Sequence, residues 1–559
     1  MNRFALAYRE QQQLFLFDKT YLGATLFKVG GFATLLSQFV VQFFRNPTVA
    51  LILSLCLLAL LSWLLWFSVR RTRAEWPVLP LCLIPAYFLG ASLSDHSLHF
   101  DALVAIFLAV AAIAWYSRIR NRRLLRGSVL TIALYALAGP ASLLFAFCAL
   151  ILDLADTGTK GWKSILYPVL AVLCACIAVL TAAVPTWGAA LTPAFWYDLD
   201  AKIPSCHLWA WISVPATVLL AVLFRFINTR KLFIFAGSVL LAALAFIPAG
   251  KVDSRLKSQE PLKTYEFEHY VANEDWDGLI KACEHSPWLP RTANYVNLAL
   301  SWRGELAERL LEYDQRGTEG LVMLTKDRAV DVAQAHLMFA MGNVAAAQDV
   351  AFNALSSLSG YCPEMLKINA QVELMRGSYD VADKYLSLLE KSLFYRKWAK
   401  DRRRFLNDDA AVEADPLLGS GRRNLEAEDA FVMFSDPMSE LFPILDANPT
   451  ERRTLEYGLC YLLLSKDLNS VKHFIEDYYS SPDSPELPRI AQEAMVFYSE
   501  YSRNVEGVEP FGLDWCYAYG VEPEVVSRFE EYQKAAMAGP ESVKRFKGTY
   551  WYYLVHTKV

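Results

Sequence analysis

Residues 48–69 read TVALILSLCLLALLSWLLWFSV, an uninterrupted apolar run of 22 residues that decides the fold class. A membrane hydrocarbon core of about 30 Å needs about 20 apolar residues in a helix, so this stretch is predicted to cross a membrane. Further apolar runs follow at 76–91, 100–117, 127–155, 164–185, 208–224 and 232–249. Residues 48–250 are therefore predicted to form a polytopic α-helical membrane domain, which excludes a wholly soluble or disordered chain.

The two halves of the chain differ in charge. Residues 1–250 carry 19 Lys and Arg against 9 Asp and Glu, while residues 251–559 carry 35 against 49, so a net charge of +10 precedes one of −14. The second half has no apolar run of span length. We predict a linker at 251–264 and a soluble α-helical domain over 265–559, which makes the whole chain all-α.

Basic loops predict the sidedness of the membrane domain, because cytoplasmic loops are rich in Lys and Arg. The basic loops lie at 70–73, 118–126, 160–163 and 225–231. All four fall on one side only if 127–155 crosses twice, as a hairpin that turns at Gly139-Pro140, where proline disfavours continued helix. A single kinked helix is the alternative. The hairpin places the second half of the chain outside, which in a bacterium with two membranes means the periplasm.

The segment 1–47 allows two interpretations. Its stretch 20–44 contains Lys28, Gln38 and the pair Gly30-Gly31, so it is a poorer span than an amphipathic interfacial helix. If 20–44 does not cross, the chain starts close to an exported loop. A further span upstream of Met1 would explain that start.

The soluble half contains helix-turn-helix units with a glycine at each turn. Gly304, Gly342 and Gly377 lie 38 and 35 residues apart, close to the tetratricopeptide (TPR) period of 34. Ala347 and Ala382 follow their glycines by five residues, while Arg309 stands at that position in the first unit. We therefore predict an irregular TPR-like α-solenoid that binds a protein partner or packs against the membrane half.

Two predicted exoplasmic loops carry the candidate site residues. The first contains Asp95, His96, His99 and Asp101, whose carboxylates and imidazoles suit acid–base chemistry or a metal. Asp101 begins a span, where ionisable groups are often functional. The alternative is a hydrated turn in which Asp95 caps the next helix.

The second loop combines aromatic and acidic residues. Trp196, Tyr197, Asp198 and Asp200 resemble a sugar site, but aromatic residues at a membrane interface are the favoured interpretation. Asp18 is a lone acidic residue ahead of the amphipathic stretch. No nucleotide-binding or serine-hydrolase motif occurs, and we expect no resident metal, no cofactor and no nucleic-acid ligand.

Several strings resemble an uncharacterised family of Bacteroidetes inner-membrane proteins with a helical-repeat tail. They are EQQQLFLFDKTYL, GGFATLLSQFVVQFF, SDHSLHFD, YALAGPASLLFAF, NYVNLAL, YDQRGTEGL and KYLSLLEKSLFYRKWA. The membrane half also resembles, more loosely, the GT-C glycosyltransferases, which use polyprenyl-phosphate sugars. That resemblance implies Asp18 as a catalytic acidic residue with Asp95, His96, His99 and Asp101 facing it, although residues 1–47 lack the paired acidic motif of those enzymes.

Two hypotheses for function follow, and whether the protein is an enzyme stays open between them. The favoured one is a non-catalytic scaffold in the lipid bilayer, whose TPR-like domain recruits partners of envelope assembly. The other is a GT-C-like glycosyl or lipid-headgroup transferase that uses a lipid-linked sugar. A transporter ranks third, because few ionisable groups lie within the spans.

Overall fold

The computed structural model is all-helical throughout the part of the chain that it describes. It describes residues 2–70, 76–95, 98–156, 161–197, 203, 205–224, 231–256, 259–285, 291–323, 330–357, 362–426, 437–449, 451–480, 484–504 and 512–557, with the backbone alone at 246–256 and 259–261. Within these ranges every regular element is a helix. The β-type pairing in these ranges is an isolated antiparallel bridge between Leu98 and Tyr197. The predicted all-α class is confirmed.

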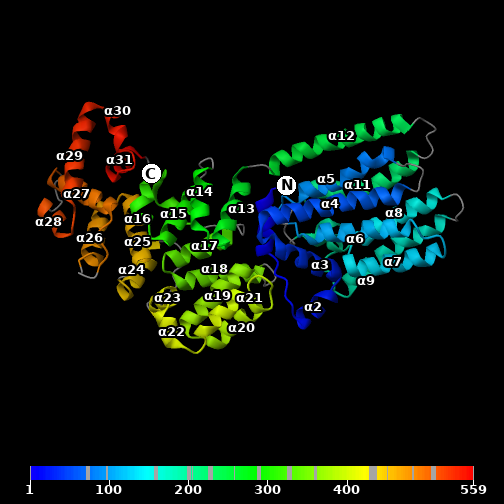
Figure 1. The fold of residues 1–559 in the computed structure, drawn as a ribbon, viewed down its shortest axis with the longest axis horizontal. Coiled ribbons are helices and arrows are strands. Elements are labelled where there is room, and N and C mark those ends of the chain that lie inside the picture. The colour runs from blue at the N-terminus through cyan, green and yellow to red at the C-terminus, as the bar shows by residue number, and fades with distance from the viewer. Residues whose placement is uncertain are drawn as a thin grey trace. The chain divides into compact units, whose positions relative to one another are not determined.

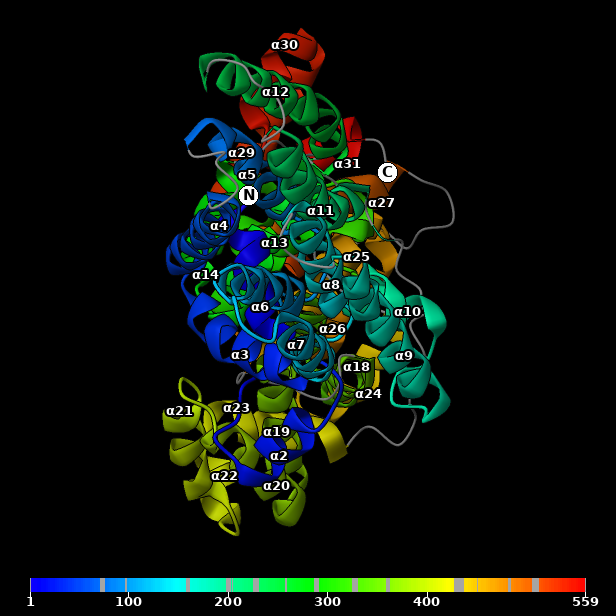
Figure 2. The same cartoon turned by 90° about the vertical axis from the view of Figure 1, so that its right-hand side faces the viewer.

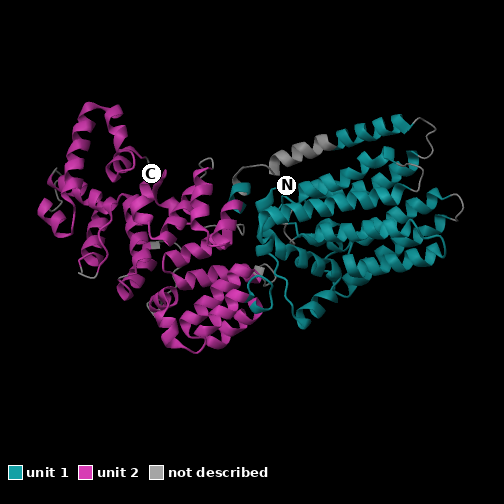
Figure 3. Cartoon of the chain, viewed as in Figure 1, with its two compact units in different colours: residues 1–265, 390–396 teal, residues 266–389, 397–559 magenta. Residues whose placement is uncertain are grey.

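The chain divides into two compact units (Figure 3). Unit 1 comprises residues 1–265 together with 390–396, and unit 2 comprises residues 266–389 and 397–559. The segment 251–264 is helical on both sides of residues 257–258, since α12 ends at Leu256 and α13 begins at Gln259.

Unit 1 is a bundle of apolar helices preceded by short helices. These elements are α1 Arg3–Ala7, η1 Tyr8–Gln11, α2 Lys19–Leu26, α3 Gly31–Val41, η2 Gln42–Arg45, α4 Pro47–Val69, η4 Trp76–Val78, α5 Leu79–Ser92, α6 Asp101–Tyr116, α7 Arg123–Ala138, α8 Ala141–Ala155, η5 Gly161–Ile165, α9 Leu166–Leu180, α10 Trp187–Leu191, η6 Pro193–Trp196, α11 Ser205–Phe224, α12 Lys231–Leu256 and α13 Gln259–Ala272. The helices α4, α6 and α8 run side by side in Figure 1, and Figure 2 views them nearly along their axes.

Within the part of the chain that the structure describes, three helices are long and apolar enough to cross a membrane. They are Pro47–Val69, Gly161–Leu180 and Ser205–Phe224. The apolar helices Trp76–Ser92, Asp101–Tyr116 and Ala141–Ala155 are shorter, and the part of α12 with described side chains, Lys231–Ala245, is also apolar. At 1.5 Å per residue, a 16-residue helix such as α6 extends only about 24 Å. The helix α6 covers residues 101–116 of the predicted run 100–117, and α12, at 26 residues, covers the whole of the run 232–249. That these two helices cross a membrane stays a prediction.

The apolar run 127–155 breaks at the predicted position. α7 ends at Ala138, Gly139 adopts a positive φ of 59°, and Pro140 is the N-cap of α8. A positive φ is costly for residues with a Cβ atom, so glycine suits the turn, and proline cannot continue the preceding helix. The two helices pack against each other as a helical hairpin, and the predicted double crossing of a membrane by this hairpin stays a prediction.

The stretch 20–44 does not form the single amphipathic helix that its sequence predicted. It divides into α2 and α3, followed by the 3₁₀ helix η2. Gly30 has a φ of 72°, and a Cβ atom at Gly31 would collide with the carbonyl oxygen of Thr25. The Gly-Gly pair therefore makes the sharp turn that separates the two helices.

Unit 2 consists of short helices joined by tight turns. They are α14 Trp276–Glu284, α15 Thr292–Arg303, α16 Leu306–Arg309, η7 Leu310–Glu312, η8 Gly317–Gly320, α17 Asp331–Ala340, α18 Val344–Ser357, α19 Pro363–Arg376, α20 Tyr379–Glu390, α21 Arg396–Arg402, η10 Arg403–Phe405, α22 Asp409–Ala414, α23 Pro416–Glu426, α24 Pro437–Ala447, α25 Arg452–Ser465, α26 Leu468–Tyr478, α27 Arg489–Asn504, α28 Leu513–Ala518, α29 Pro523–Ala538, α30 Pro540–Val543, η11 Lys544–Phe546 and α31 Tyr550–His556. Two of these helices include one residue of unit 1 each: Glu390 ends α20 and Arg396 begins α21.

The three repeat glycines all lie in helix–helix turns with positive φ. Their φ values are 68° at Gly304, 82° at Gly342 and 75° at Gly377. Ala347 and Ala382 are buried where their helices pack. The second helix of the first unit is shorter than its sequence predicted, because α16 gives way to the 3₁₀ turn η7 immediately after Arg309.

Candidate functional site

The two predicted loops of unit 1 meet in space. The backbone N–H of His99 donates to the carbonyl oxygen of Trp196 at 3.0 Å, and Leu98 forms the isolated bridge with Tyr197. The Tyr197 hydroxyl lies 3.0 Å from Nδ1 of His207, at the start of α11. Side chains that sequence placed in separate loops therefore share one end of the bundle.

Arg9 holds the first of these loops in place. Its Nη2 donates to the carbonyl oxygens of Leu93 at 2.9 Å and Asp95 at 2.8 Å, and its Nη1 donates to that of Leu98. The side chain is buried, and this burial lowers the pKa of the Arg9 guanidinium to about 10, partly offset by the nearby Asp95. Arg9 is therefore still protonated at neutral pH, and it brings a buried positive charge to the loop junction.

Asp101 is the buried carboxylate of the junction. It lies in the first turn of α6, where its Oδ2 accepts a hydrogen bond of 2.7 Å from Thr34 Oγ1 on α3. Its Oδ1 is buried and has no hydrogen-bond partner among the described residues, and the same holds for Nε2 of the buried His207. Buried polar atoms of this kind normally bind water or a ligand.

The aromatic residues of the second loop are buried. Trp196 packs against Trp211 with ring centroids 5.5 Å apart, and Tyr197 packs against His207 at 5.5 Å. Burial raises the pKa of the Tyr197 phenol. Both rings therefore pack into unit 1. The favoured interpretation, that these aromatic residues lie at a membrane interface, stays a prediction.

Asp18 has a different set of contacts. It is the N-cap of α2, where its Oδ2 accepts from the Tyr21 backbone N–H at 3.2 Å, and its Oδ1 forms an ion pair of 3.0 Å with Lys391. The hydrogen bond from Lys391 lowers the pKa of the Asp18 carboxyl. None of these contacts joins Asp18 to Asp95 or Asp101. The candidates His96, Asp198 and Asp200 lie outside the described residues.

A second buried carboxylate, Asp153, was missed by the sequence analysis. Its Oδ2 accepts from the hydroxyls of Tyr116 at 2.7 Å and Ser164 at 2.5 Å, while its Oδ1 lies 3.2 Å from Nη2 of Arg123. These contacts join α6, α7, α8 and η5. An acidic residue within the apolar run 127–155 was the available signal, because such residues are costly in a membrane unless they have partners.

Unit 2 presents a surface of tryptophan and arginine, which we call the Trp–Arg surface: Trp276, Trp302, Arg303, Arg452 and Arg453. The two half-buried indole rings stack with centroids 5.4 Å apart and planes 2° from parallel. The Arg453 guanidinium lies 4.8 Å from the Trp302 ring centroid, within cation–π range. The sequence analysis missed this surface because its members come from three helices.

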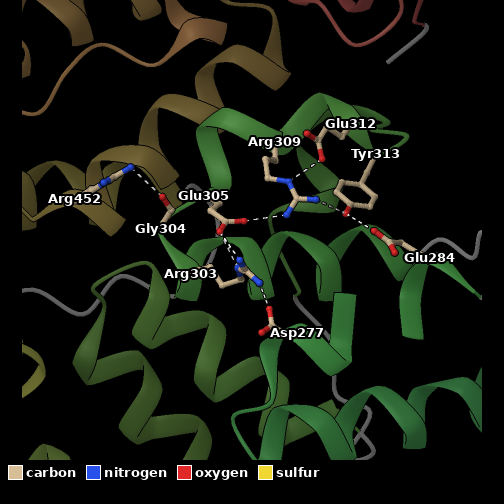
Figure 4. A network of polar contacts seen from close by, with 9 residues as sticks. All are labelled: Asp277, Glu284, Arg303, Gly304, Glu305, Arg309, Glu312, Tyr313 and Arg452. Carbon is tan, nitrogen blue, oxygen red and sulfur yellow. Dashed lines mark hydrogen bonds and ion pairs between the residues drawn. The ribbon is translucent and has the colours of Figure 1, made fainter. Parts of the chain in front are cut away.

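A network of ion pairs borders the Trp–Arg surface (Figure 4). Arg303 pairs with Asp277 and with Glu305 at 2.7 Å, and Glu305 also pairs with Arg309 at 2.9 Å. Hydrogen bonds from the two arginines hold the pKa of Glu305 below its usual range. Arg452 Nη2 donates to the Gly304 carbonyl oxygen at 3.0 Å, which ties α25 to the end of α15.

Comparison with known proteins places the chain in a family. Within the described ranges, no group of three or more His, Cys, Asp or Glu residues is arranged to hold a metal ion. A family model, described as a family of unknown function (DUF6057), matches residues 1–557, so the chain belongs to that family. No curated protein and no solved structure matches the chain.

Proposed function

We propose that this member of the DUF6057 family is a multi-span protein of the bacterial inner membrane that recruits a protein partner through unit 2. The observation that carries the proposal is the surface of unit 1. Among the described residues, unit 1 exposes 45 large hydrophobic side chains and unit 2 exposes seven. Soluble proteins rarely expose contiguous apolar surface on this scale, so the surface of unit 1 suits contact with lipid.

The helix α9 illustrates this arrangement. Val169, Val172, Leu173 and Ile177 are exposed along one face, whereas the buried face carries Tyr167 and three alanines. The large apolar side chains thus point outward and the smaller residues allow close helix packing, as in membrane proteins. The shorter helices require partners within the bundle, because lipid offers no hydrogen bonds to their ends.

The proposed topology rests on the basic loops and the helical hairpin. With α7 and α8 each crossing, the loops that contain Arg123 and Lys163 share the cytoplasmic side, as the excess of positive charge favours. Unit 2 then lies in the periplasm.

The Trp–Arg surface is the proposed binding site for the partner. Tryptophan and arginine are enriched among the residues that contribute most to protein–protein affinity. The charges of Arg303 and Arg452 are largely balanced by Asp277, Glu305 and Glu456, so we expect recognition through the stacked Trp276 and Trp302 rings rather than by net charge.

Extraction and cross-linking test the proposal together. The full chain is expected to stay in the membrane pellet after alkaline carbonate treatment. Cross-linking in intact cells is expected to give a discrete product that Trp302→Ala abolishes and Phe352→Ala preserves, since Phe352 is an exposed apolar residue elsewhere in unit 2. Release of the chain at alkaline pH contradicts the membrane assignment. An unchanged product with Trp302→Ala contradicts the partner site.

The loop junction of unit 1 supports a second candidate, a GT-C-like transferase that acts on a lipid-linked sugar. Asp95 and His99 are half-buried and Asp101 is buried, so the group does not splay into solvent, and Arg9 adds a fixed positive charge. Membrane vesicles supplied with a labelled polyprenyl-phosphate sugar test this candidate. Transfer that requires the chain and is abolished by Asp101→Asn, with the cross-linked product intact, favours the transferase, whereas no transfer removes it.

A further inference from the structure

Aromatic rings form a continuous chain on one surface of unit 1. Phe15 packs against Phe17 at 5.0 Å between ring centroids and against Phe39 at 5.5 Å. Phe43 lies 5.8 Å from Phe39 and 5.9 Å from Phe394. The segments 15–43 and 390–396 of unit 1, distant in sequence, therefore share one surface.

Much of this surface is apolar and exposed. Phe27, in the turn between α2 and α3, is 91% exposed. Along α3, Phe32, Leu36 and Phe39 are exposed at helical spacing and form one stripe. Leu393 and Phe394 extend the apolar area.

The opposite face of α3 is fixed to the bundle. The Gly30 backbone N–H donates to the Ala136 carbonyl oxygen at 2.9 Å, and Thr34 donates to Asp101 at 2.7 Å. Tyr21 donates to Gln38, which joins α2 to α3. The exposed stripe is thus held outward by contacts on its inner side.

The segments that form the apolar area are also rich in basic residues. The segments 15–45 and 390–396 contain five basic residues, Lys19, Lys28, Arg45, Lys391 and Arg396, against the two carboxylates Asp18 and Glu390. Asp18 is already paired with Lys391. The net charge of these segments is therefore +3, and we call the surface formed by their exposed aromatic, apolar and basic residues the aromatic–basic face.

Chain connectivity sets the depth of this face. η2 ends at Arg45, and the candidate span α4 begins two residues later at Pro47. If α4 crosses the bilayer, Arg45 lies at the boundary between the hydrocarbon and the headgroups. Exposed aromatic residues with Lys and Arg beside them are typical of segments that lie in that layer.

We propose that the aromatic–basic face lies in the headgroup layer and binds anionic phospholipid, with Phe27 inserted among the acyl chains. The inference rests on the proposed membrane function and adds the class of lipid that the protein selects. Charge complementarity argues for this ligand, because polybasic segments are attracted to anionic leaflets and the attraction weakens with salt.

A fluorophore at position 27 tests the insertion. Full-length Phe27→Cys, in a background with the exposed Cys56 replaced by Ser, is reconstituted into bilayers that contain spin-labelled lipid. Met537→Cys is the matched control, because Met537 is 89% exposed in unit 2. We expect strong quenching at position 27 and little at position 537. Equal quenching at the two positions contradicts the inference.

Charge substitutions test the lipid selectivity. The triple variant Lys19→Gln, Lys28→Gln, Arg396→Gln removes exposed basic residues of the face, and Lys534→Gln, Arg545→Gln, Lys547→Gln removes equally exposed ones from unit 2. Purified full-length protein in mixed micelles is assayed for retained phosphatidylglycerol relative to phosphatidylcholine. We expect the wild type and the control to prefer phosphatidylglycerol by about tenfold at low salt, with the preference lost in the first variant.

The outcomes separate this inference from the proposed function. If the wild type resists alkaline extraction but shows no preference for phosphatidylglycerol, the lipid inference fails while the membrane assignment stands. If the wild type is extracted, the membrane assignment fails. Equal loss of preference in both triple variants also overturns the inference, because the effect would then be one of overall charge.

Discussion

The two units follow opposite rules for placing polar and apolar residues. Unit 1 exposes apolar side chains along α4, α9 and α11 and buries Arg9, Asp101 and Asp153. Unit 2 exposes charged residues, and its buried charges include the ion pair of Glu364 and Lys367 at 2.9 Å, with His336 3.0 Å from Glu364. Both units consist of helices, so the type of secondary structure does not decide which residues face outward, and the proposed contact of unit 1 with lipid accounts for the difference.

The largest expected effect comes from removing a buried charge of unit 1. Arg9→Ala leaves the carbonyl oxygens of Leu93 and Leu98 without the Arg9 donor, while the Asp95 carbonyl oxygen still accepts from the Leu98 backbone N–H. Each stranded buried acceptor costs about 1–3 kcal/mol, so we expect a loss of about 3–5 kcal/mol. Thermal unfolding of the purified protein measures it. Arg303→Ala in unit 2 is the control and is expected to cost under about 1 kcal/mol, because its ion pairs are exposed. Equal losses of stability in the two variants would contradict the contrast between a buried charge in unit 1 and an exposed one in unit 2.

A charge on the outward face comes next. Val172 is exposed near the middle of the candidate span Gly161–Leu180. Val172→Lys is expected to make the free energy of membrane insertion less favourable by about 2.5–3.5 kcal/mol, the cost of a charge at the centre of a spanning helix. Phe352→Lys in unit 2 is expected to change stability by no more than about 0.5 kcal/mol. The membrane-inserted fraction and the yield of folded protein measure these effects, and an unaffected Val172→Lys would mean that α9 faces water.

A buried carboxyl of unit 2 gives a pH test. Burial raises the pKa of Glu493 from 4.5 to about 7, although the Tyr550 backbone N–H hydrogen bond opposes the shift. The folded state therefore keeps this proton after the unfolded chain has released it, so the stabilisation is full below about pH 4.5 and is lost as the pH rises through 7. We expect a decrease on the order of 2–3 kcal/mol, since one pKa unit is about 1.4 kcal/mol. Chemical denaturation across this pH range measures it.

Glu493→Gln is the matching variant. Glutamine keeps an acceptor for the Tyr550 N–H and cannot ionise, so this part of the pH dependence should disappear. Glu364 has the opposite sign: burial raises its pKa, but Lys367 and His336 outweigh burial and lower it to about 2. Its contribution is therefore present above about pH 4.5 and is lost as the pH falls toward 2. If Glu493→Gln left the pH dependence between 4.5 and 7 unchanged, the assignment of that step to Glu493 would be wrong.

The smallest expected effect compares two turns within unit 2. Gly342→Ala meets both a positive φ and a Cβ position occupied by Thr454 and Asn424, whereas Gly377→Ala meets positive φ with open space around it. We expect losses of about 2–3 and about 1 kcal/mol, because positive φ alone costs an alanine about 1–2 kcal/mol. Denaturant midpoints of the two variants provide the test. Equal losses would show that the contact at Gly342 relaxes freely.

The sequence predicted the features that depend on local pattern. Apolar run length marked α4, and the pair Gly139-Pro140 marked the break between α7 and α8, because each signal lies within one contiguous stretch. Gly30-Gly31 carried an equally local signal for the break between α2 and α3. The spacing of Gly304, Gly342 and Gly377 marked the turns of unit 2 for the same reason.

The rest depends on partners distant in sequence. Arg9 binds backbone carbonyls 84 to 89 residues away, and any residue type can supply such an acceptor, so no side-chain motif announces them. Trp276 and Trp302 stack only because α14 and α15 pack together. The Asp95–Asp101 turn was found from its composition, whereas its junction with Trp196 and Tyr197 required the fold.

Topological labelling tests the central claim most directly. Lys163→Cys and Asn273→Cys, each in the Cys56→Ser background, lie at exposed positions before α9 and after α13. Three proposed crossings, α9, α11 and α12, separate them. In intact cells whose outer membrane has been made permeable, an impermeant thiol reagent is expected to label position 273 at once and position 163 only after the inner membrane is opened. Immediate labelling of both positions would contradict the claim that unit 1 crosses the membrane and holds unit 2 on its outer side.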